Sequence, residues 1–265
     1  MTTMTTTTTA ASTPPGPGRL PHPRAQPLRP GSAKEDKVRR YVDDRLLHIN
    51  RRYVKKFGLA DPTDDVVGYA SMADMCRDLE ALVNILWLSG TPTLQVPYLL
   101  NLAGDFNEWL THFPPAPAAT LALLRKLDHC FASLLDGRDV DTHEPLPGFE
   151  DGRRRAGLTG TDMVRCRSTV EQTRRLVVDV MSNEAPEDED DQDDNPGAWM
   201  TDTEAETDGS VARVGVWEED EDRLHMDVAR VYENTLVQLG ARLGDGGGVG
   251  AVQMTNDWEA LGKSC

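Results

Sequence analysis

The sequence lacks the motifs by which most enzymes and secreted proteins are recognised. Its four cysteines, Cys76, Cys130, Cys166 and Cys265, form no CxxC pair, so neither a zinc ribbon nor a disulfide framework is predicted. Reduced thiols of this kind are typical of a cytosolic or nuclear protein. No apolar run is long enough to span a bilayer, and no secretory signal pattern opens the chain. We therefore expect no membrane partner.

Catalytic motifs are missing as well. No HExxH or GxSxG pattern occurs among the 265 residues. The stretch Gly262–Lys263–Ser264 mimics the end of a phosphate-binding loop, but Asp257 stands where the preceding glycine is required. His129 adjoins Cys130, yet no second pair of ligands has zinc-like spacing. The sequence predicts no catalytic, metal or cofactor site and no small-molecule substrate.

Apolar and aromatic residues are scarce, at 38% and 6% of the chain, and the mean hydropathy is −0.49. A chain of this composition does not pack throughout its length. The formal net charge of −16 is unevenly placed. Between Glu184 and Asp222 there are seventeen acidic residues and one basic residue, Arg213, while the rest of the chain is neutral. The acidity therefore belongs to one segment and not to the folded part.

Five stretches follow from this composition. Residues 1–33 form a Thr-rich and then Pro-rich tail that we expect to be disordered, because it has too few large apolar side chains to offset the entropy of ordering. Residues 34–182 are predicted to form a helical bundle domain. Residues 183–219 are an acidic segment expected to be disordered. A C-terminal helix is predicted over 220–241, followed by a Gly-rich flexible tail over 242–265.

What the chain does have is a series of amphipathic helices. Apolar residues three and four positions apart, bounded by capping residues and prolines, predict helices over about 34–57, 72–88, 98–113, 118–135, 160–181 and 220–239. The predicted fold class is all-α, a small irregular bundle of about five to six helices. The prolines between Phe113 and Ala118 form a short corner, so the two central helices are expected to pack on each other.

Apolar side chains are more numerous in the central helices than so short a bundle is expected to bury. The run ILWL around Trp87 is apolar on all sides, and Phe106, Trp109 and Phe113 cluster on the next helix. We interpret these four aromatic residues as partner-binding residues that hold other protein subunits.

The first helix ends in a basic cluster formed by Arg51, Arg52, Lys55 and Lys56. One interpretation is a solvated face whose charges suit the negative end of the helix dipole. The other is contact with an acidic partner or with phosphate. Four basic residues are few for independent nucleic-acid binding. Any DNA contact is therefore expected to be indirect or weak.

One stretch carries a family resemblance. The segment Leu94–Leu135, and above all TLALLRKLDHCFASLL after YLLNLAGDFNEWLTHFP, resembles the small helical subunit family of the fungal upstream activation factor for RNA polymerase I. The resemblance implies a non-catalytic structural subunit that is located in the nucleus, within the nucleolus. Such a subunit would hold partners at ribosomal DNA during transcription initiation. That family has no catalytic residues to transfer to this chain.

Two other functions are compatible with the same pattern. A chromosome-associated or meiotic recombination accessory protein would also be helical and non-catalytic. A small helical enzyme or ligand-binding protein would instead require a polar cavity inside the bundle. The sequence alone does not separate these alternatives from the first.

Overall fold

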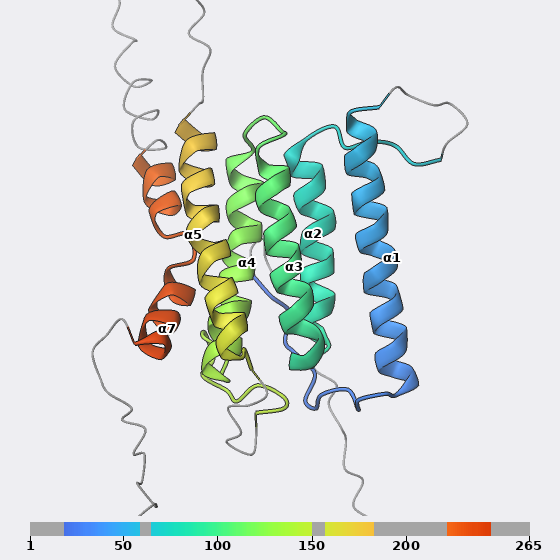
Figure 1. Cartoon of the computed structure of the whole chain (residues 1–265), viewed down its shortest axis with the longest axis vertical. Coiled ribbons are helices and arrows are strands. Elements are labelled where there is room, and N and C mark those ends of the chain that lie inside the picture. The colour runs from blue at the N-terminus through green and yellow to red at the C-terminus, as the bar shows by residue number, and fades with distance from the viewer. Residues whose placement is uncertain (1–18, 59–64, 150–156, 183–221, 245–265) are drawn as a thin grey trace, which may run out of the picture.

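The computed structural model describes residues 19–58, 65–149, 157–182 and 222–244, and in these residues the fold is all-α (Figure 1). This confirms the predicted small helical bundle. Residues 222–229 are helical as well, and an isolated bridge joins Arg138 and Pro145. The named helices are α1 (Ala33–Lys56), α2 (Met72–Leu88), α3 (Pro92–Leu110), α4 (Pro117–Asp136), α5 (Gly160–Ser182) and α7 (Glu233–Leu243).

Local side-chain caps explain where several helices begin and end. The Ser32 and Ser71 hydroxyls accept hydrogen bonds from the backbone N–H three residues later, at the starts of α1 and α2. Before α5, Thr159 and Asp162 each bind the other's backbone N–H, which makes a reciprocal capping box. Helix α4 ends at Gly137, which adopts a left-handed conformation with φ of 78°. These signals are local, and most of the predicted helices agree closely with the structure. The exception is α3, which begins at Pro92 and ends at Leu110, so that Pro97 lies inside the helix and not at its first turn.

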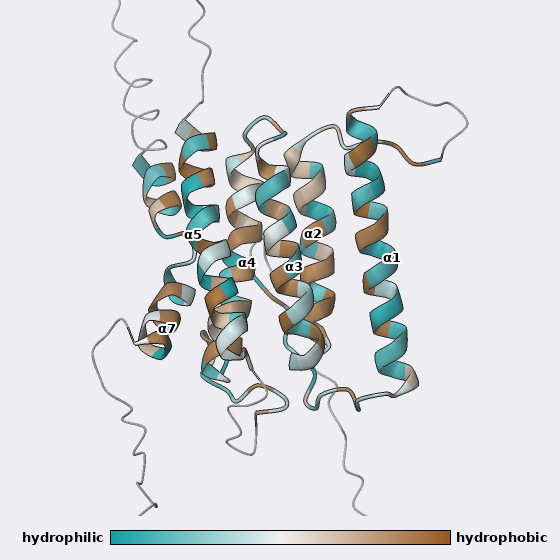
Figure 2. Ribbon diagram, viewed as in Figure 1, coloured by the Kyte–Doolittle hydropathy of each residue, from teal (hydrophilic) through white to brown (hydrophobic). Residues whose placement is uncertain are grey.

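Helices α1 to α5 run alongside one another, with α1 at one edge and α5 and α7 at the other (Figure 1). Helix α2 packs mainly on α4, α3 mainly on α5, and α4 also on α7. Helices α3 and α4 do touch, but they are not each other's main neighbours. The proline corner makes them neighbours in space. Each of them is apolar on more than one face, and most of its apolar surface packs against another helix. Figure 2 shows α1 as the most hydrophilic helix and the brown, hydrophobic residues gathered on the inner helices.

The N-terminal strap, defined as residues 19–32, differs from the predicted disordered tail. Leu28 is buried, and its backbone N–H donates a 2.9 Å hydrogen bond to the Thr91 hydroxyl at the start of α3. The Arg24 side chain lies over Gly90 at the turn between α2 and α3. The few apolar residues among the prolines therefore suffice to hold this stretch on the bundle. Residues 1–18 lie outside the described residues, as do 183–221 and 245–265.

The predicted helix over 220–241 is divided in the structure. Residues 222–229 are helical, residues 230–232 form a turn, and α7 follows. Tyr232 has a left-handed backbone conformation with φ of 57°, and its buried ring lies 6.2 Å from that of Phe131. A left-handed residue costs about 1–2 kcal/mol. Burial of an aromatic ring against α4 offsets that cost. The break in the helix therefore places Tyr232 in the core.

Candidate interaction surfaces

The four aromatic residues predicted to bind a partner lie inside the bundle. Trp87 and Phe106 are 0% exposed, Trp109 is 2% exposed and Phe113 is 6% exposed. Helix α1 covers part of this cluster, because the Tyr53 ring lies 5.9 Å from that of Trp109 and 6.4 Å from that of Phe113. In this structure these side chains are core residues. Their role in partner binding stays a prediction, and a surface open to partners has to be found elsewhere.

The basic cluster at the end of α1 divides into two kinds of residue. Arg52 donates hydrogen bonds to the Asp78 carboxylate at 2.7 Å and to the Val67 carbonyl at 3.1 Å. Its guanidinium also lies 3.9 Å from the centre of the Tyr69 ring. Lys56 lies over the ring of Phe113. These two cations attach α1 and the following segment to the bundle.

Replacing Arg52 with alanine is expected to lower the free energy of unfolding by about 1–3 kcal/mol, because the partly buried Asp78 carboxylate loses its shortest ion pair. Urea unfolding followed by circular dichroism measures this difference. The matched control is Arg51→Ala one residue earlier, on the exposed side of α1, which should leave the unfolding midpoint nearly unchanged. Equal losses in the two variants would show that Arg52 behaves as an ordinary surface charge.

Arg51 and Lys55 face a shallow hollow on the outer side of α1. We call this hollow the α1 groove; its volume is about 400 Å³ and its walls are formed by Asn50, Arg51, Val54, Lys55 and Val66. Val54 is 65% exposed, and Leu47, one turn before Arg51, is exposed too. The groove thus combines cationic and apolar side chains on the outer surface, a mixture that suits protein contacts.

One carboxylate of α4 holds the first turn of the C-terminal helix on the bundle. Asp128, 7% exposed, accepts hydrogen bonds from the Thr235 hydroxyl at 2.6 Å, the Thr235 N–H at 2.8 Å and the Asn234 side-chain amide at 3.0 Å. Helix α7 has no side-chain cap of its own. Asp128 supplies that cap from another helix and places a negative charge at the positive end of the α7 dipole. This geometry makes α7 part of the bundle.

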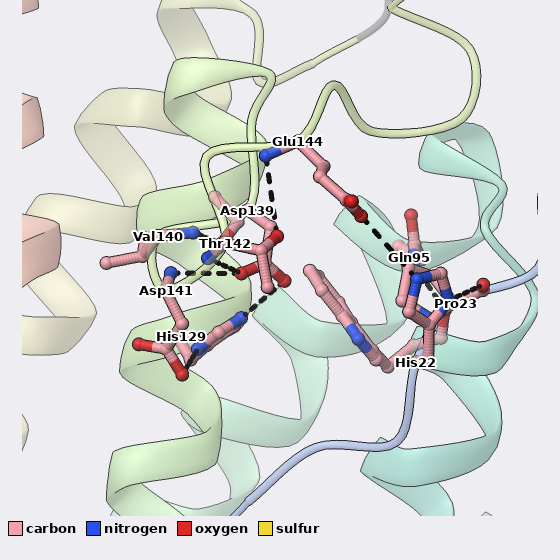
Figure 3. Close-up of polar contacts among 11 residues, drawn as sticks. His22, Pro23, Gln95, His129, Asp139, Val140, Asp141, Thr142 and Glu144 are labelled. Carbon is pink, nitrogen blue, oxygen red and sulfur yellow. Dashed lines mark hydrogen bonds and ion pairs between the residues drawn. The ribbon is translucent and has the colours of Figure 1, made fainter. Parts of the chain in front are cut away.

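A cavity of about 770 Å³ with both polar and apolar walls lies between the N-terminal strap and the loop after α4. Figure 3 shows polar side chains of the strap and the loop. On the loop side, His129 Nε2 lies 3.0 Å from Asp139 Oδ2. Asp139 also accepts hydrogen bonds from the backbone amides of Asp141 and Thr142, both at 2.9 Å. On the strap side, His22 Nε2 lies 3.6 Å from a Glu144 carboxylate oxygen.

Asp139 fixes this loop. Burial alone would raise the pKa of Asp139, but hydrogen bonds from the Thr142 amide and from His129 outweigh it and hold the pKa below its ordinary value of 3.8. The group is therefore ionised at neutral pH and accepts all of these hydrogen bonds. The stability it contributes is present above that ordinary value and is lost as the pH falls through the lowered pKa. His129 and Asp139 thus have a structural explanation, since they hold the loop on α4.

The cavity differs from the one that the enzyme hypothesis requires. The strap and the loop after α4 form most of its wall, and only Trp87 and His129 of its lining come from helices. The three cysteines in the described residues are buried, and burial raises the pKa of Cys76 and Cys166 to about 12 and that of Cys130 further. Such thiols are protonated at neutral pH and are poor nucleophiles. Within the described ranges, no cluster of three or more His, Cys, Asp or Glu side chains could hold a metal ion.

The helices that the structure describes include none with the length and apolar character needed to cross a membrane. Together, the fold and these surfaces define an all-α bundle protein with a basic and apolar outer helix and a docked C-terminal helix. The chain belongs to the TFB6 family, described as subunit 11 of the general transcription factor TFIIH, because that family's model matches residues 68–240. The match covers α2 to α5 and most of α7, and it begins after α1.

Two relatives from yeasts are similar to this chain. One is the "General transcription and DNA repair factor IIH subunit TFB6" of Saccharomyces cerevisiae, with 28% identity over 57% of this chain and 54% of that protein. The chain therefore spans about half the length of that relative. The other is an uncharacterized protein of Schizosaccharomyces pombe, with 23% identity over 56% of this chain and 80% of that protein. No solved structure matches the chain.

These findings correct the family prediction. The resemblance of Leu94–Leu135 to the upstream activation factor of RNA polymerase I is wrong, and so is the predicted role in RNA polymerase I transcription at ribosomal DNA. The comparisons give the predicted nucleolar location no support. The structure shows why the pattern misled. The leucines of that stretch, including Leu121, Leu124 and Leu127, are buried core residues of α4. Any amphipathic helix packed on two sides produces such spacing.

Two features of these surfaces were missed from the sequence. Thr235 stands at a core-facing position of its helix, and a polar residue in an apolar stripe signals a buried hydrogen-bond partner. That signal pointed to a partner but not to Asp128, which lies 107 residues earlier in the chain. The contact between His129 and Asp139 had no such signal. Asp139 lies in the loop after α4, and the conformation of that loop cannot be read from helical periodicity.

Proposed function

We propose that this protein is a non-catalytic helical subunit of a TFIIH-type general transcription factor in the nucleus, where it binds other protein subunits. The observation that carries the proposal is the family match over residues 68–240. The named Saccharomyces relative is a subunit of the same factor. The name of that relative refers to general transcription and DNA repair, and not to the RNA polymerase I machinery.

The chemistry of the described residues supports a binding role over a catalytic one. The thiols are buried and protonated, and the polar groups around the cavity are paired with one another. The α1 groove, by contrast, presents exposed apolar and cationic side chains. Proteins that act by holding other chains expose this kind of mixed surface.

Affinity purification of the tagged chain from its own cells, followed by mass spectrometry, tests the proposal. We expect the other TFIIH subunits to be enriched at least tenfold over an untagged control. A second control is the tagged Asp128→Ala variant, whose C-terminal helix should be detached from a bundle that otherwise stays folded. Recovery of RNA polymerase I factors, or of no transcription factor at all, would contradict the proposal.

A further inference from the structure

We propose that the acidic segment of this chain, residues 183–221, docks on the α1 groove of the same molecule, with Trp199 as its apolar anchor. The proposal concerns contacts within one chain and does not depend on membership of a TFIIH assembly. It follows from the charge of the groove, the composition of the segment and the distance that each part of the segment can span.

The groove belongs to the most basic helix of the fold. Helix α1 contains nine Lys or Arg residues and four acidic residues. Several of these cations have partners within the bundle, since Arg45 and Arg52 pair with Asp78 and Arg39 pairs with Glu35. Arg51 is exposed and has no ion-pair partner among the described residues. It stands beside the exposed side chain of Val54, so cationic and apolar surfaces adjoin at one place.

The segment has the complementary composition. Residues 183–221 hold sixteen acidic residues and one basic residue, Arg213. Eight of the acidic residues lie between Glu184 and Asp194, and Trp199 and Met200 follow five residues later. The acidic run is complementary in charge to the cations of the groove, and the neighbouring aromatic side chain can pack on its valines. Because both belong to one chain, the local concentration of the segment near the groove is about millimolar, which favours docking without any strong individual contact.

Distance along the chain selects Trp199 over Trp217. The segment is held between the end of α5 and the start of the helical residues 222–229. Figure 1 shows that both of these ends lie at the same end of the bundle as the C-terminal end of α1. From α5 to α1 the path crosses α3 and α2, three helix-packing distances of about 8–10 Å each, or roughly 25–30 Å.

The reach of each tryptophan follows from its separation from these two points. Trp199 is seventeen residues from Ser182 and twenty-three from Asp222. At about 3.3 Å per residue it can therefore reach α1 from either side. Trp217 is five residues from Asp222 and spans about 17 Å at most, which is too short. The two tryptophans therefore form a matched pair for a test.

Zero-length carbodiimide cross-linking of the full-length protein tests the docking, because this reagent joins a lysine amine to a carboxylate in direct contact. We expect amide links between Lys55 and carboxylates of residues 184–208 in the monomeric fraction, identified by mass spectrometry. Since the attraction is electrostatic, raising the salt from about 0.05 M to about 0.5 M should reduce the yield severalfold.

Paired variants separate a defined site from general charge attraction. Arg51→Glu and Trp199→Ala should each lower the yield of links to Lys55 at least fivefold. The controls Arg175→Glu, on the exposed face of α5, and Trp217→Ala should change it less than twofold. All four positions lie on the surface or outside the described residues, and circular dichroism verifies that each variant is folded.

Three results would overturn the proposal. The first is the absence of links between Lys55 and the acidic segment at low salt. The second is finding such links only in covalent dimers, which would assign the groove to a second copy of the chain. The third is an equal effect of the matched variants, which would show non-specific attraction. None of these results bears on recovery of TFIIH subunits, so the two proposals fail independently.

Discussion

Replacing Trp109 with alanine is expected to lower the free energy of unfolding by about 3–5 kcal/mol. The indole of this α3 residue is 2% exposed, and its ring centre lies 5.9 Å from that of Tyr53 on α1. Truncation removes the buried apolar surface and leaves a cavity that the surrounding helices cannot fully close. Urea unfolding, followed by circular dichroism at two or more protein concentrations, measures the change.

The control for this variant is Tyr41→Ala on α1. Tyr41 is a large aromatic residue too, but its side chain is exposed, so its truncation should cost far less. A similar loss in both variants would mean that Trp109 does not pack in the core as the structure shows. Leu127→Ala, at a buried position of α4, provides an independent core variant with an expected cost of about 2–5 kcal/mol.

Replacing Asp128 with alanine is expected to release α7 from the bundle. The change leaves the Thr235 N–H and the Asn234 side-chain amide without their acceptor, while the Thr235 hydroxyl keeps only its 3.2 Å bond to the main-chain carbonyl of residue 128. Hydrogen bonds to a charged group contribute about 1.5–3 kcal/mol each, and buried donors that lose their acceptor add a desolvation cost. We expect a total loss of about 3–5 kcal/mol from the free energy of docking α7.

Hydrogen exchange locates this effect within the chain. In Asp128→Ala, the backbone amides of α7 should exchange much faster while those of α2 and α3 keep their protection. Asp227→Ala is the matched control, because Asp227 pairs with Arg125 of the same helix α4 at a more exposed position, where an ion pair contributes less. Faster exchange throughout the bundle in Asp128→Ala would show that the carboxylate supports the whole fold and not α7 alone.

The functional residues predicted from the sequence illustrate a limit of amphipathic patterns. Trp87 and Trp109 were correctly placed on apolar helix faces, but the surface available to cover them was underestimated. Helix α1 contributes little apolar surface overall, yet its Tyr53 covers Trp109 and Phe113. A count of apolar residues per helix does not reveal that one well-placed ring closes a cluster. The difference between a core residue and an exposed one depends on which helices become neighbours.

The basic cluster shows the same limit for charge. Arg51 and Arg52 are adjacent in the sequence and chemically alike. In an α-helix successive residues point about 100° apart, so Arg52 faces Asp78 of α2 while Arg51 faces outward. The packing of the bundle decides which of these two directions faces a neighbouring helix. The sequence of α1 alone does not contain this information.

The sequence by itself determined the class of the fold and the limits of most helices. Serine and threonine caps, the proline corner before α4 and Gly137 after it act within one turn of the chain, so they can be recognised without a structure. The tertiary structure alone decided how the helices pair, where the last helix breaks at Tyr232, and that Asp128 caps a helix 107 residues away. The physical reason is range, because caps and periodicity are local interactions. Burial and the hydrogen bonds that join distant segments exist only once the bundle has brought those segments together.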